Sequence, residues 1–474
     1  MNSILAAAKI RMAIIKPLSS FILFASILTL GNGCATLPDV TDLIEEAPAA
    51  QKPLHIVSSK GPLSAQRSRA IMERLKHSAD QSDMLSRHTA VIETVSESQL
   101  TKGNKVTLLA DGHATYDAMF KAIRHARHTI NLETFLIEND EIGRKFSDLL
   151  LQKQASGVQV NLIYDSVGSV ETGPAFFRRL KDGGVHLVQF SPINPAKTHW
   201  SSRQKHPDHR KLLIIDGRLA ITGGINISSN YSISPSGGSK GSGAKLPWRD
   251  TDVQVEGPAV GEFQKLFLAT WKKQQGPKLT EANYFPTLKE EGNALVRVVG
   301  STPGGKNRIT FIVYVSAITF AEHSIHLTNA YFVPDDQIME AFTDAAKRGV
   351  DVKIILPAKT DSTLALHAAR YNYSELLKAG VKIYERRKAI LHAKTAVIDG
   401  VWSTVGSTNL DYLSLLHNDE VNAVVLNREF AVEMEQMFAK DLADSDQIHW
   451  KKWKDRPLLQ KMNELLAHMF SRSL

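Results

Sequence analysis

Two histidine–lysine pairs recur at a constant spacing in this sequence. The first copy comprises His209, Lys211, Asp216, Gly223 and Asn226, and the second comprises His392, Lys394, Asp399, Gly406 and Asn409. Each residue of the first copy returns 183 positions later, since 392 − 209 = 183. Five polar or glycine positions in identical register indicate a duplicated unit.

Each histidine–lysine pair leads into a short apolar segment typical of a buried strand, 212–215 in one copy and 395–398 in the other. Side chains two positions apart on a strand share a face, so each copy offers one imidazole beside one ammonium group. Two facing copies suit a phosphodiester. One imidazole attacks phosphorus, the other protonates the leaving oxygen, and the lysines neutralise the phosphoryl oxygens. The alternative, two ordinary buried histidines bonded to backbone, explains neither the lysines nor the repeat.

The remaining motif residues have supporting roles in this scheme. Asp216 and Asp399 complete the candidate catalytic set, but they lie five positions beyond their lysines and face away on a straight strand. We therefore expect them to hold the strand and its loop. Asn226 and Asn409 follow a glycine-containing turn, so their amides are candidates for binding the substrate phosphate or a lysine.

Two acidic residues are candidates for orienting the imidazoles. Asp252 and Glu420 each begin an apolar strand after a polar turn, where a carboxylate can hold a histidine in its reactive tautomer. The alternative is a surface salt bridge. If Asp252 corresponds to Glu420, the offset between the two copies is 168 at this point. Since the offset at the motif is 183, the first copy has 183 − 168 = 15 additional residues in the Gly/Ser-rich loop 228–247. That loop either borders the active site or is an insertion without a function.

Strand and helix patterns alternate on both sides of the duplication. Expected strands in the first half are 106–110, 128–137, 158–164 and 187–190, and expected helices are 116–126 and 143–156. The second half repeats this order. We therefore predict an α/β fold of two tandem pseudo-symmetric domains, each a mixed sheet covered by helices, with the active site at their interface.

The first 33 residues read as an export signal. A basic region with Lys9, Arg11 and Lys16 precedes an apolar stretch at 17–30, which is shorter than the roughly 20 residues of a membrane span. Cys34 follows directly and is the only cysteine. It resembles the lipidation site of a bacterial lipoprotein, although Gly31 stands where leucine is usual; an uncleaved anchor is the alternative. By resemblance, Ala35 favours the outer membrane, on the periplasmic side.

The other boundaries follow from composition. We expect a tether and helical region at 34–100, with a helix laid on the first domain, then domain 1 at 101–275, a linker at 276–295, domain 2 at 296–445 and a basic, aromatic C-terminal helix at 446–474. The tail places Trp450 and Trp453 among lysines before an apolar helix face. This pattern suits a membrane interface or packing on domain 2. The chain of 474 residues carries a formal charge of +8, which suits an anionic partner.

The repeated His-x-Lys-x4-Asp motif resembles that of the phospholipase D superfamily. The flanking segments 208–218, 248–260, 391–412 and 418–422 are similar to those of bacterial cardiolipin synthases. This resemblance implies two phospholipase D-type domains over about residues 100–474. It also implies transfer of a phosphatidyl group from one phosphatidylglycerol to another through a phosphohistidine, without cofactor or metal. By the same resemblance His209 is the nucleophile and His392 the acid and base.

Two rival activities share this motif. A phospholipase D that passes the phosphatidyl group to water would keep every catalytic residue. A secreted nuclease would need a groove of basic and aromatic residues, and no such stripe is visible beyond the tail, so we expect no nucleic-acid partner. The expected partners are an anionic phospholipid and a membrane surface, while the sequence leaves the oligomeric state open.

Overall fold

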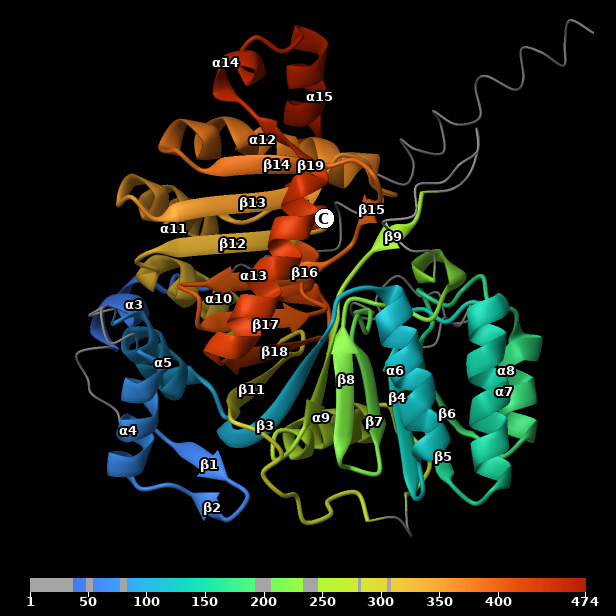
Figure 1. Cartoon of the computed structure of the whole chain (residues 1–474). Helices are drawn as coiled ribbons and strands as arrows, with labels where there is room; N and C mark the ends of the chain where they lie inside the picture. Colours follow the sequence, from blue (N-terminus) through green and yellow to red (C-terminus); the bar gives the residue numbers. More distant parts are fainter. Residues whose placement is uncertain are drawn as a thin grey trace, which may run out of the picture. The chain divides into compact units, whose positions relative to one another are not determined.

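The computed structural model describes residues 37–47, 54–76, 83–191, 206–232, 246–279, 283–304 and 308–474. Both halves of the duplication lie in one compact unit, residues 38–472. Figure 1 shows the first half in cyan to yellow-green and the second in yellow to red.

The first half is a mixed sheet whose strands pair in the order β6-β5-β4-β7-β8-β10-β3. Its strands are β3 (Leu100–Leu109), β4 (Thr129–Thr134), β5 (Gln159–Asp165), β6 (His186–Phe190), β7 (Lys211–Ile215), β8 (Leu219–Gly223) and β10 (Asp252–Glu256). Its helices are α6 (Gly112–His125), α7 (Glu141–Ala155), α8 (Pro174–Asp182) and α9 (Val260–Lys273). Asp111 and Asp140 start α6 and α7 by accepting a backbone N–H three residues on.

The second half repeats the same pairing order, β14-β13-β12-β16-β17-β18-β11. Its strands are β11 (Ala294–Ser301), β12 (Ser324–Asn329), β13 (Asp351–Pro357), β14 (Lys382–Arg386), β16 (Lys394–Ile398), β17 (Trp402–Gly406) and β18 (Glu420–Leu426). Its helices are α10 (Ile309–Phe320), α11 (Asp336–Lys347), α12 (Thr363–Ala379) and α13 (Arg428–Ala443). The predicted α/β fold with a duplicated, pseudo-symmetric unit is confirmed.

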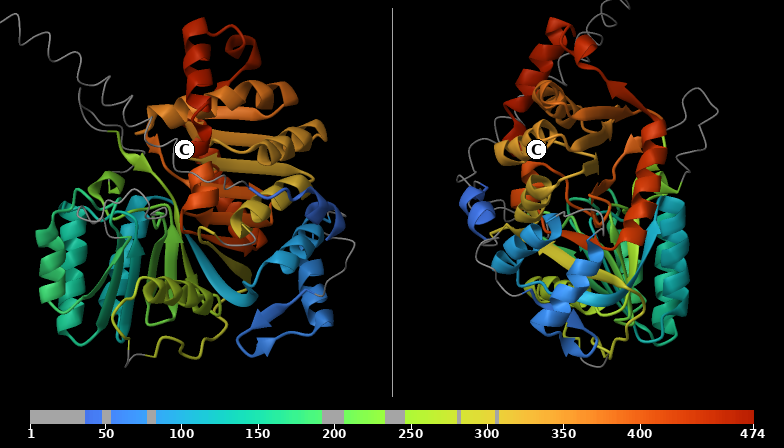
Figure 2. Two further views of the ribbon diagram at one scale, coloured as in Figure 1. Left: turned by 180° about the vertical axis from the view of Figure 1, so that it is seen from behind. Right: turned by 60° about the vertical axis from the view of Figure 1, so that its left-hand side comes forward.

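The two sheets join edge to edge through β3 and β11, which pair antiparallel. Helices α6, α7 and α8 cover one face of the first sheet, as both views in Figure 2 show. Helices α9 and α13 instead contribute Phe263, Phe267, Phe430 and Met434 to a buried apolar core that contains strands of both halves. This shared core holds the first half of the duplication against the second, because closely packed interiors resist displacement.

The N-terminal elements correct one expectation. They are α3 (Thr41–Glu46), β1 (Ile56–Ser58), β2 (Gly61–Pro62), α4 (Ala65–Leu75) and α5 (Met84–Val95). Helix α5 packs on α10 of the second half, where His88 Nδ1 lies 2.9 Å from Ser316 Oγ and Trp402 Nε1 donates to His88 Nε2 at 3.2 Å. The prediction that this helix lies on the first domain was therefore wrong. An apolar face does not reveal which of two similar domains it covers.

Short elements complete the chain: β9 (Trp248–Arg249), β15 (Ile390–Leu391), β19 (Ser445–Ile448), α14 (Trp450–Trp453) and α15 (Leu458–His468). Strand β19 extends the second sheet beside β14. Within the described ranges, every helix is too short or too polar to cross a bilayer. The export signal 1–33 and Cys34 lie outside the described residues.

Candidate active site

His209 is held by a carboxylate from the opposite half of the chain. Its Nδ1 lies 3.0 Å and 3.1 Å from the two carboxylate oxygens of Glu420, at the start of β18. Burial would raise the pKa of Glu420, but His209, Lys211 and a hydroxyl donated by Ser407 lower it. Glu420 is therefore an anion that accepts the Nδ1 proton, which leaves Nε2 of His209 with a free lone pair.

His392 is held in the same way by the first half. Its Nδ1 lies 2.7 Å from Oδ2 of Asp250. Lys394 Nζ is also 2.9 Å from this nitrogen, but an ammonium group only donates, and Nδ1 carries the proton that Asp250 accepts. The ammonium group donates instead to the carbonyl oxygen of His392. Burial and then the charge of Lys394 lower the pKa of His392 to about 4.

Two short parallel bridges produce this crossed pairing. On one side, His209 N donates to Asp419 O at 2.9 Å and Asp419 N donates to Pro207 O at 3.1 Å. On the other side, β9 pairs parallel with β15, and His392 N donates to Arg249 O at 2.8 Å. In each bridge a histidine strand runs beside the segment that carries the opposite carboxylate. Neither histidine is therefore oriented by its own half.

Asp250, rather than Asp252, is the first-half counterpart of Glu420. Strand β10 pairs Asp252 with Gly223, and β18 pairs Asn422 with Gly406. Since Gly223 and Gly406 are equivalent, the true offset is 422 − 252 = 170, and 250 + 170 = 420. The predicted offset of 168 was wrong by two residues, so the loop adds 183 − 170 = 13 residues rather than 15.

Asp252 serves the turn that follows β8. Its Oδ1 accepts the backbone N–H of Ile225 at 3.1 Å. Burial and the neighbouring charge of Asp250 raise the pKa of Asp252 well above its usual value, which favours its neutral form. The prediction that Asp252 orients an imidazole is corrected, because its carboxyl group faces the turn and not a histidine.

The two lysines lie buried beside their histidines. Lys211 Nζ donates to the carbonyl oxygen of His209 at 2.6 Å. Burial lowers the pKa of Lys211 to about 7, opposed by Glu420 and reinforced by Lys394. Burial, followed by the charges of Lys211 and Lys394, lowers the pKa of His209, and Glu420 opposes this shift. These mutual effects place both ammonium groups and both imidazoles in one electrostatic neighbourhood, which suits a phosphodiester anion.

Gly224, directly after β8, makes room for the carboxylate of Asp250. A Cβ atom on Gly224 would lie 2.2 Å from Oδ1 of Asp250. The equivalent position in the second half is Ser407, whose hydroxyl donates to Glu420. The halves therefore differ here: the first leaves space for its carboxylate, whereas the second supplies a hydrogen bond to it.

Asp216 and Asp399 lie at the far ends of their strands. Asp216 accepts the backbone N–H groups of residues 127, 128 and 129, with the shortest contact, 2.7 Å, at His128. Asp399 accepts those of residues 322, 323 and 324. Both have positive φ, +53° and +50°. Their geometry tethers the turn to the start of a neighbouring strand, which is the role that the sequence predicted for them.

The two asparagines are buried close to the histidines. Asn226 Nδ2 donates to Tyr231 Oη at 3.0 Å, and that hydroxyl lies 3.4 Å from His392 Nδ1. Asn409 Nδ2 lies 3.4 Å from Ser414 Oγ. The amide oxygen of each asparagine is buried with no hydrogen-bond partner. Both amides are thus in position to rearrange around a bound phosphate.

Aromatic residues line the site, and the His-x-Lys motif did not predict them. Phe135 meets the His209 ring edge-on with 5.1 Å between centroids, and Lys211 Nζ lies 5.0 Å from the Phe135 centroid. Tyr331 meets His392 edge-on at 6.1 Å, and its hydroxyl donates to Asp361 at 2.5 Å. Both follow the strands β4 and β12, so pairing of those strands with the motif strands would have revealed them.

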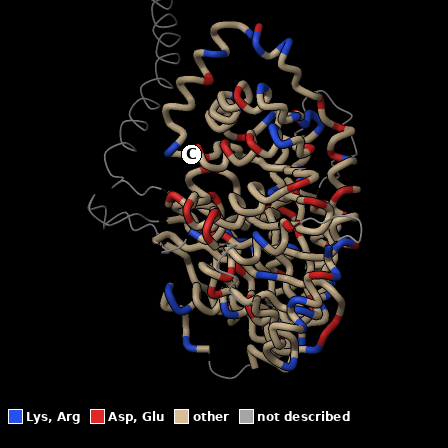
Figure 3. The backbone as a smooth tube through the Cα atoms, turned by 90° about the vertical axis from the view of Figure 1, so that its left-hand side faces the viewer, with Lys and Arg blue, Asp and Glu red and all other residues tan. Residues whose placement is uncertain are grey.

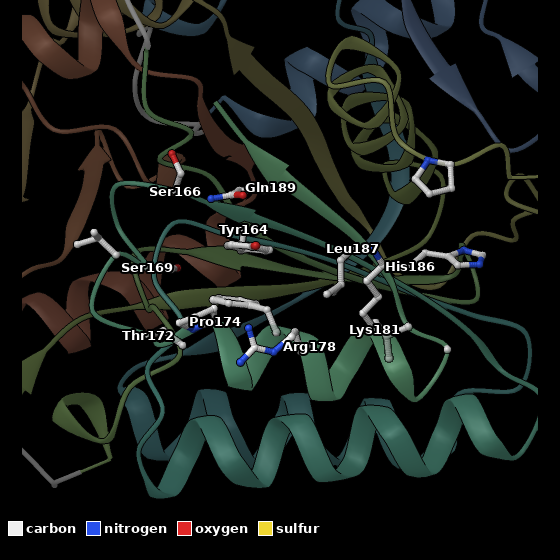
Figure 4. A pocket seen from close by; sticks show the side chains of 15 residues that line it. Tyr164, Ser166, Ser169, Thr172, Pro174, Arg178, Lys181, His186, Leu187 and Gln189 are labelled. Carbon is white, nitrogen blue, oxygen red and sulfur yellow. The ribbon is translucent and has the colours of Figure 1, made fainter. Parts of the chain in front are cut away.

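A groove of about 910 Å³ lies on the first half (Figure 4), and the residues that line it do not include the candidate catalytic histidines or lysines. Apolar side chains of Tyr164, Phe177 and Leu187 line it, and Lys181 lies along it. Ser169, at one end, donates its hydroxyl to the carbonyl of Phe135, the residue in contact with His209. The groove is thus linked to the surroundings of His209 through Ser169 and Phe135.

Comparisons with known proteins agree with this geometry. The family described as cardiolipin synthase, PLD-like domain, matches residues 119–233 and 314–442. A cardiolipin synthase of Alkalihalophilus pseudofirmus is 32% identical over 403 residues, which cover 84% of this chain and 77% of that protein. One of Listeria monocytogenes is 34% identical over 374 residues, covering 78% and 76%. The solved phosphatidylserine synthase of Haemophilus influenzae covers 78% of this chain and 93% of its own, with a TM-score of 0.55 and 13% identity, a likeness of fold.

The fold and the paired histidine motifs define a phospholipase D-like enzyme. The chain belongs to the phospholipase D-like family of cardiolipin synthases. It is thus an enzyme of the phosphatidyltransferase type.

Proposed function

We propose that this enzyme makes cardiolipin by moving the phosphatidyl group of one phosphatidylglycerol onto the free hydroxyl of a second. The observation that carries the proposal is the crossed pair of contacts, Glu420 to His209 and Asp250 to His392. Each contact fixes the Nδ1 proton and leaves Nε2 available. One phosphodiester replaces another, so the reaction needs no energy-rich donor.

The first step forms a covalent intermediate. Nε2 of His209 attacks phosphorus, and a P–N bond forms as the P–O bond to glycerol breaks. His392 gives its Nε2 proton to the departing oxygen. Lys211 and Lys394 offset the charge that builds on the phosphoryl oxygens.

The second step reverses the first with a new alcohol. His392, now neutral, takes the proton from the hydroxyl of the second phosphatidylglycerol, whose oxygen attacks phosphorus. The P–N bond breaks and His209 is released. Apolar side chains of the groove next to Phe135 offer a surface for one acyl chain of the bound lipid.

Substrate binding shifts the pKa of His392 in the direction that this cycle needs. In the free enzyme burial, followed by the charges of Lys394 and Lys211, lowers that pKa. A bound phosphodiester carries a negative charge that opposes both lysines, so binding raises the pKa of His392 and favours its role as an acid.

Incubation of the purified enzyme with phosphatidylglycerol labelled in its headgroup glycerol tests the proposal. Thin-layer chromatography should show labelled cardiolipin together with free labelled glycerol. Free labelled glycerol without labelled cardiolipin, together with unlabelled phosphatidic acid revealed by a phosphorus stain, would identify a hydrolase and overturn the transferase assignment. The matched control, His209→Ala, should give neither lipid product.

We further propose that the enzyme works at a membrane, as a lipoprotein on the periplasmic side of a bacterial envelope. Support comes from the sequence: the export signal 1–33 ends next to Cys34, the only cysteine. Palmitate labelling of cells that express the protein should mark it, and Cys34→Ser should abolish the label. Unchanged labelling of that variant would remove the lipoprotein assignment.

A further inference from the structure

Helix α15 presents its apolar side to solvent. Its exposed residues share one face at helical spacing, and they are Leu458 (73% exposed), Leu459 (69%), Met462 (51%), Leu465 (50%), Leu466 (54%) and the adjoining Met469 (72%). The opposite face, with Glu464 and Ala467, is buried against the second half. This orientation reverses the usual arrangement of an amphipathic helix on a soluble domain, where the apolar face packs inward.

Specific contacts hold the helix in this orientation. Arg456, just before α15, forms a 2.6 Å ion pair with the buried carboxylate of Glu464 and lies over the Trp453 ring at 4.4 Å. At the other end His468 stacks on Tyr371 of α12 with 3.9 Å between ring centroids. The polar face is thus anchored, and the apolar face is left uncovered by the described part of the chain.

Basic residues flank the exposed face. Lys451, Lys452 and Lys454 are exposed on and after α14, and Lys461 lies on α15 itself. Figure 3 shows several basic segments, with acidic ones between them, along the uppermost part of the tube, which corresponds to α14 and α15 in Figure 1. Apolar residues beside lysines and Trp450 are the composition of a helix that lies in the interface of an anionic bilayer.

Contacts of Ala467 and Leu474 link the C-terminal end of α15 to the active-site end of the second half. Leu413, four residues beyond Asn409, donates its N–H to the carbonyl of Leu474 at 2.8 Å. Ala467 packs with Val333, whose N–H donates to the carbonyl of Leu410, next to Asn409. The end of the chain is therefore fixed to the loop that carries a candidate substrate-binding residue.

Other exposed apolar side chains occur at the same end. Leu413 is 38% exposed and Leu364, at the start of α12, is 36% exposed. On the first half, Val167 and Val170 are 49% and 66% exposed in the turn after β5, around the Ser169 that bonds Phe135. Exposed apolar surface gathered near a site marks an interaction surface.

We propose that α15 inserts its apolar face into a bilayer that contains anionic phospholipid, and so presents the active site to lipid substrates. The choice of partner rests on the proposed function. A second copy of the chain fits less well, because two facing α15 helices would bring like-charged lysines together, whereas lipid phosphates complement them.

An environment-sensitive dye on the helix tests the insertion directly. The full chain carries Cys34→Ser, His209→Ala to prevent turnover, and a single labelled cysteine at Met462→Cys. The matched control carries the label at Val432→Cys, an equally exposed position on α13. With phosphatidylcholine vesicles that contain phosphatidylglycerol, emission at position 462 should shift to the blue and be quenched by lipid-borne nitroxides, while position 432 should not respond.

Each other outcome of this experiment overturns the inference. No response at position 462, or an equal response at both positions, would mean that α15 does not enter the bilayer. A blue shift at position 462 that grows with protein concentration in the absence of lipid would identify a second copy as the partner.

A double substitution on α15 distinguishes binding of the membrane from catalysis at the active site. Leu459→Glu combined with Leu466→Glu should lower cardiolipin formation from vesicles by about tenfold or more, because charge replaces apolar surface in the interface. Turnover of a soluble p-nitrophenyl phosphodiester should stay unchanged, and Val432→Glu should affect neither. Equal loss on both substrates, or no loss on vesicles, would overturn the docking role. If the unsubstituted enzyme makes no cardiolipin, the proposed function fails, and the dye experiment still decides the docking.

Discussion

Glu420 of the second half holds His209 of the first, with 3.0 Å between Oε1 and Nδ1. The reciprocal contact joins Asp250 to His392 at 2.7 Å. Because each histidine is oriented from across the duplication, a single half of this chain cannot assemble either histidine–carboxylate pair.

The first prediction separates Asp250 from Asp252. Asp250→Asn should lower kcat by about 10²-fold or more, because an amide does not fix the tautomer of His392 as a carboxylate does. Asp252→Asn should change kcat less than about threefold, since burial already favours the neutral form of Asp252 and an amide oxygen can still accept from Ile225. Steady-state kinetics on phosphatidylglycerol checks the pair. A larger loss in Asp252→Asn would restore the sequence-based assignment.

The second prediction uses the unequal turns after β8 and β17. Gly224→Ala places a methyl group where the Asp250 carboxylate lies, so we expect a loss of about 10²-fold in kcat through misplacement of His392. Ser407→Ala removes only a hydroxyl bonded to Glu420 and should cost about tenfold or less. Comparison of the two kcat values, with circular dichroism as the folding control, tests this. Equal losses would argue against the steric account.

The third prediction concerns Asp216. Asp216→Ala removes the acceptor of three backbone N–H groups, so the free energy of unfolding should fall by about 1–3 kcal/mol. Activity per folded molecule should stay within about threefold at a temperature below the transition. Denaturant unfolding and active-site titration measure the two effects. If Asp216→Ala is fully stable but inactive, Asp216 takes part in catalysis.

The fourth prediction is a pH dependence. Lys211 is cationic below about pH 7 in the free enzyme and neutral above it, because burial lowers its pKa to about 7. The value of kcat/KM should therefore fall as the pH rises through about 7. An arginine at position 211 keeps its charge at every working pH. In Lys211→Arg the fall of kcat/KM on the alkaline side of the pH profile should therefore shift to higher pH, even if overall activity drops. If the fall of kcat/KM at alkaline pH is unchanged in Lys211→Arg, the titration of a group other than Lys211 causes it.

The sequence predicted the elements that repeat and failed where the two halves interact. Two copies of His-x-Lys on apolar strands predicted the duplication and the residues at its centre, and the alternation of strand and helix patterns predicted the α/β fold. The acidic partner of His392 was misplaced by two residues, because the polar turn before β10 has no periodicity to fix its alignment. Only the antiparallel register of Asp252 with Gly223 sets it.

Packing between segments that are distant in the sequence could also not be predicted from sequence patterns. Helix α5 has an apolar face, but its pattern does not say that Ser316 and Trp402 of the second half receive it. The apolar pattern of α15 was equally compatible with burial and exposure. Its orientation depends on the ion pair between Arg456 and Glu464, eight residues apart, which turns the polar side inward.

The most direct test of the mechanism is to locate the covalent intermediate. His392→Ala keeps the nucleophile, so with a p-nitrophenyl phosphodiester, whose leaving group needs no proton, it should accumulate a phosphohistidine at His209. His209→Ala should form none with any substrate. Digestion without acid followed by mass spectrometry identifies the modified residue. An adduct on His392 in the His209→Ala variant, with none in His392→Ala, would contradict the assignment and reverse the two roles.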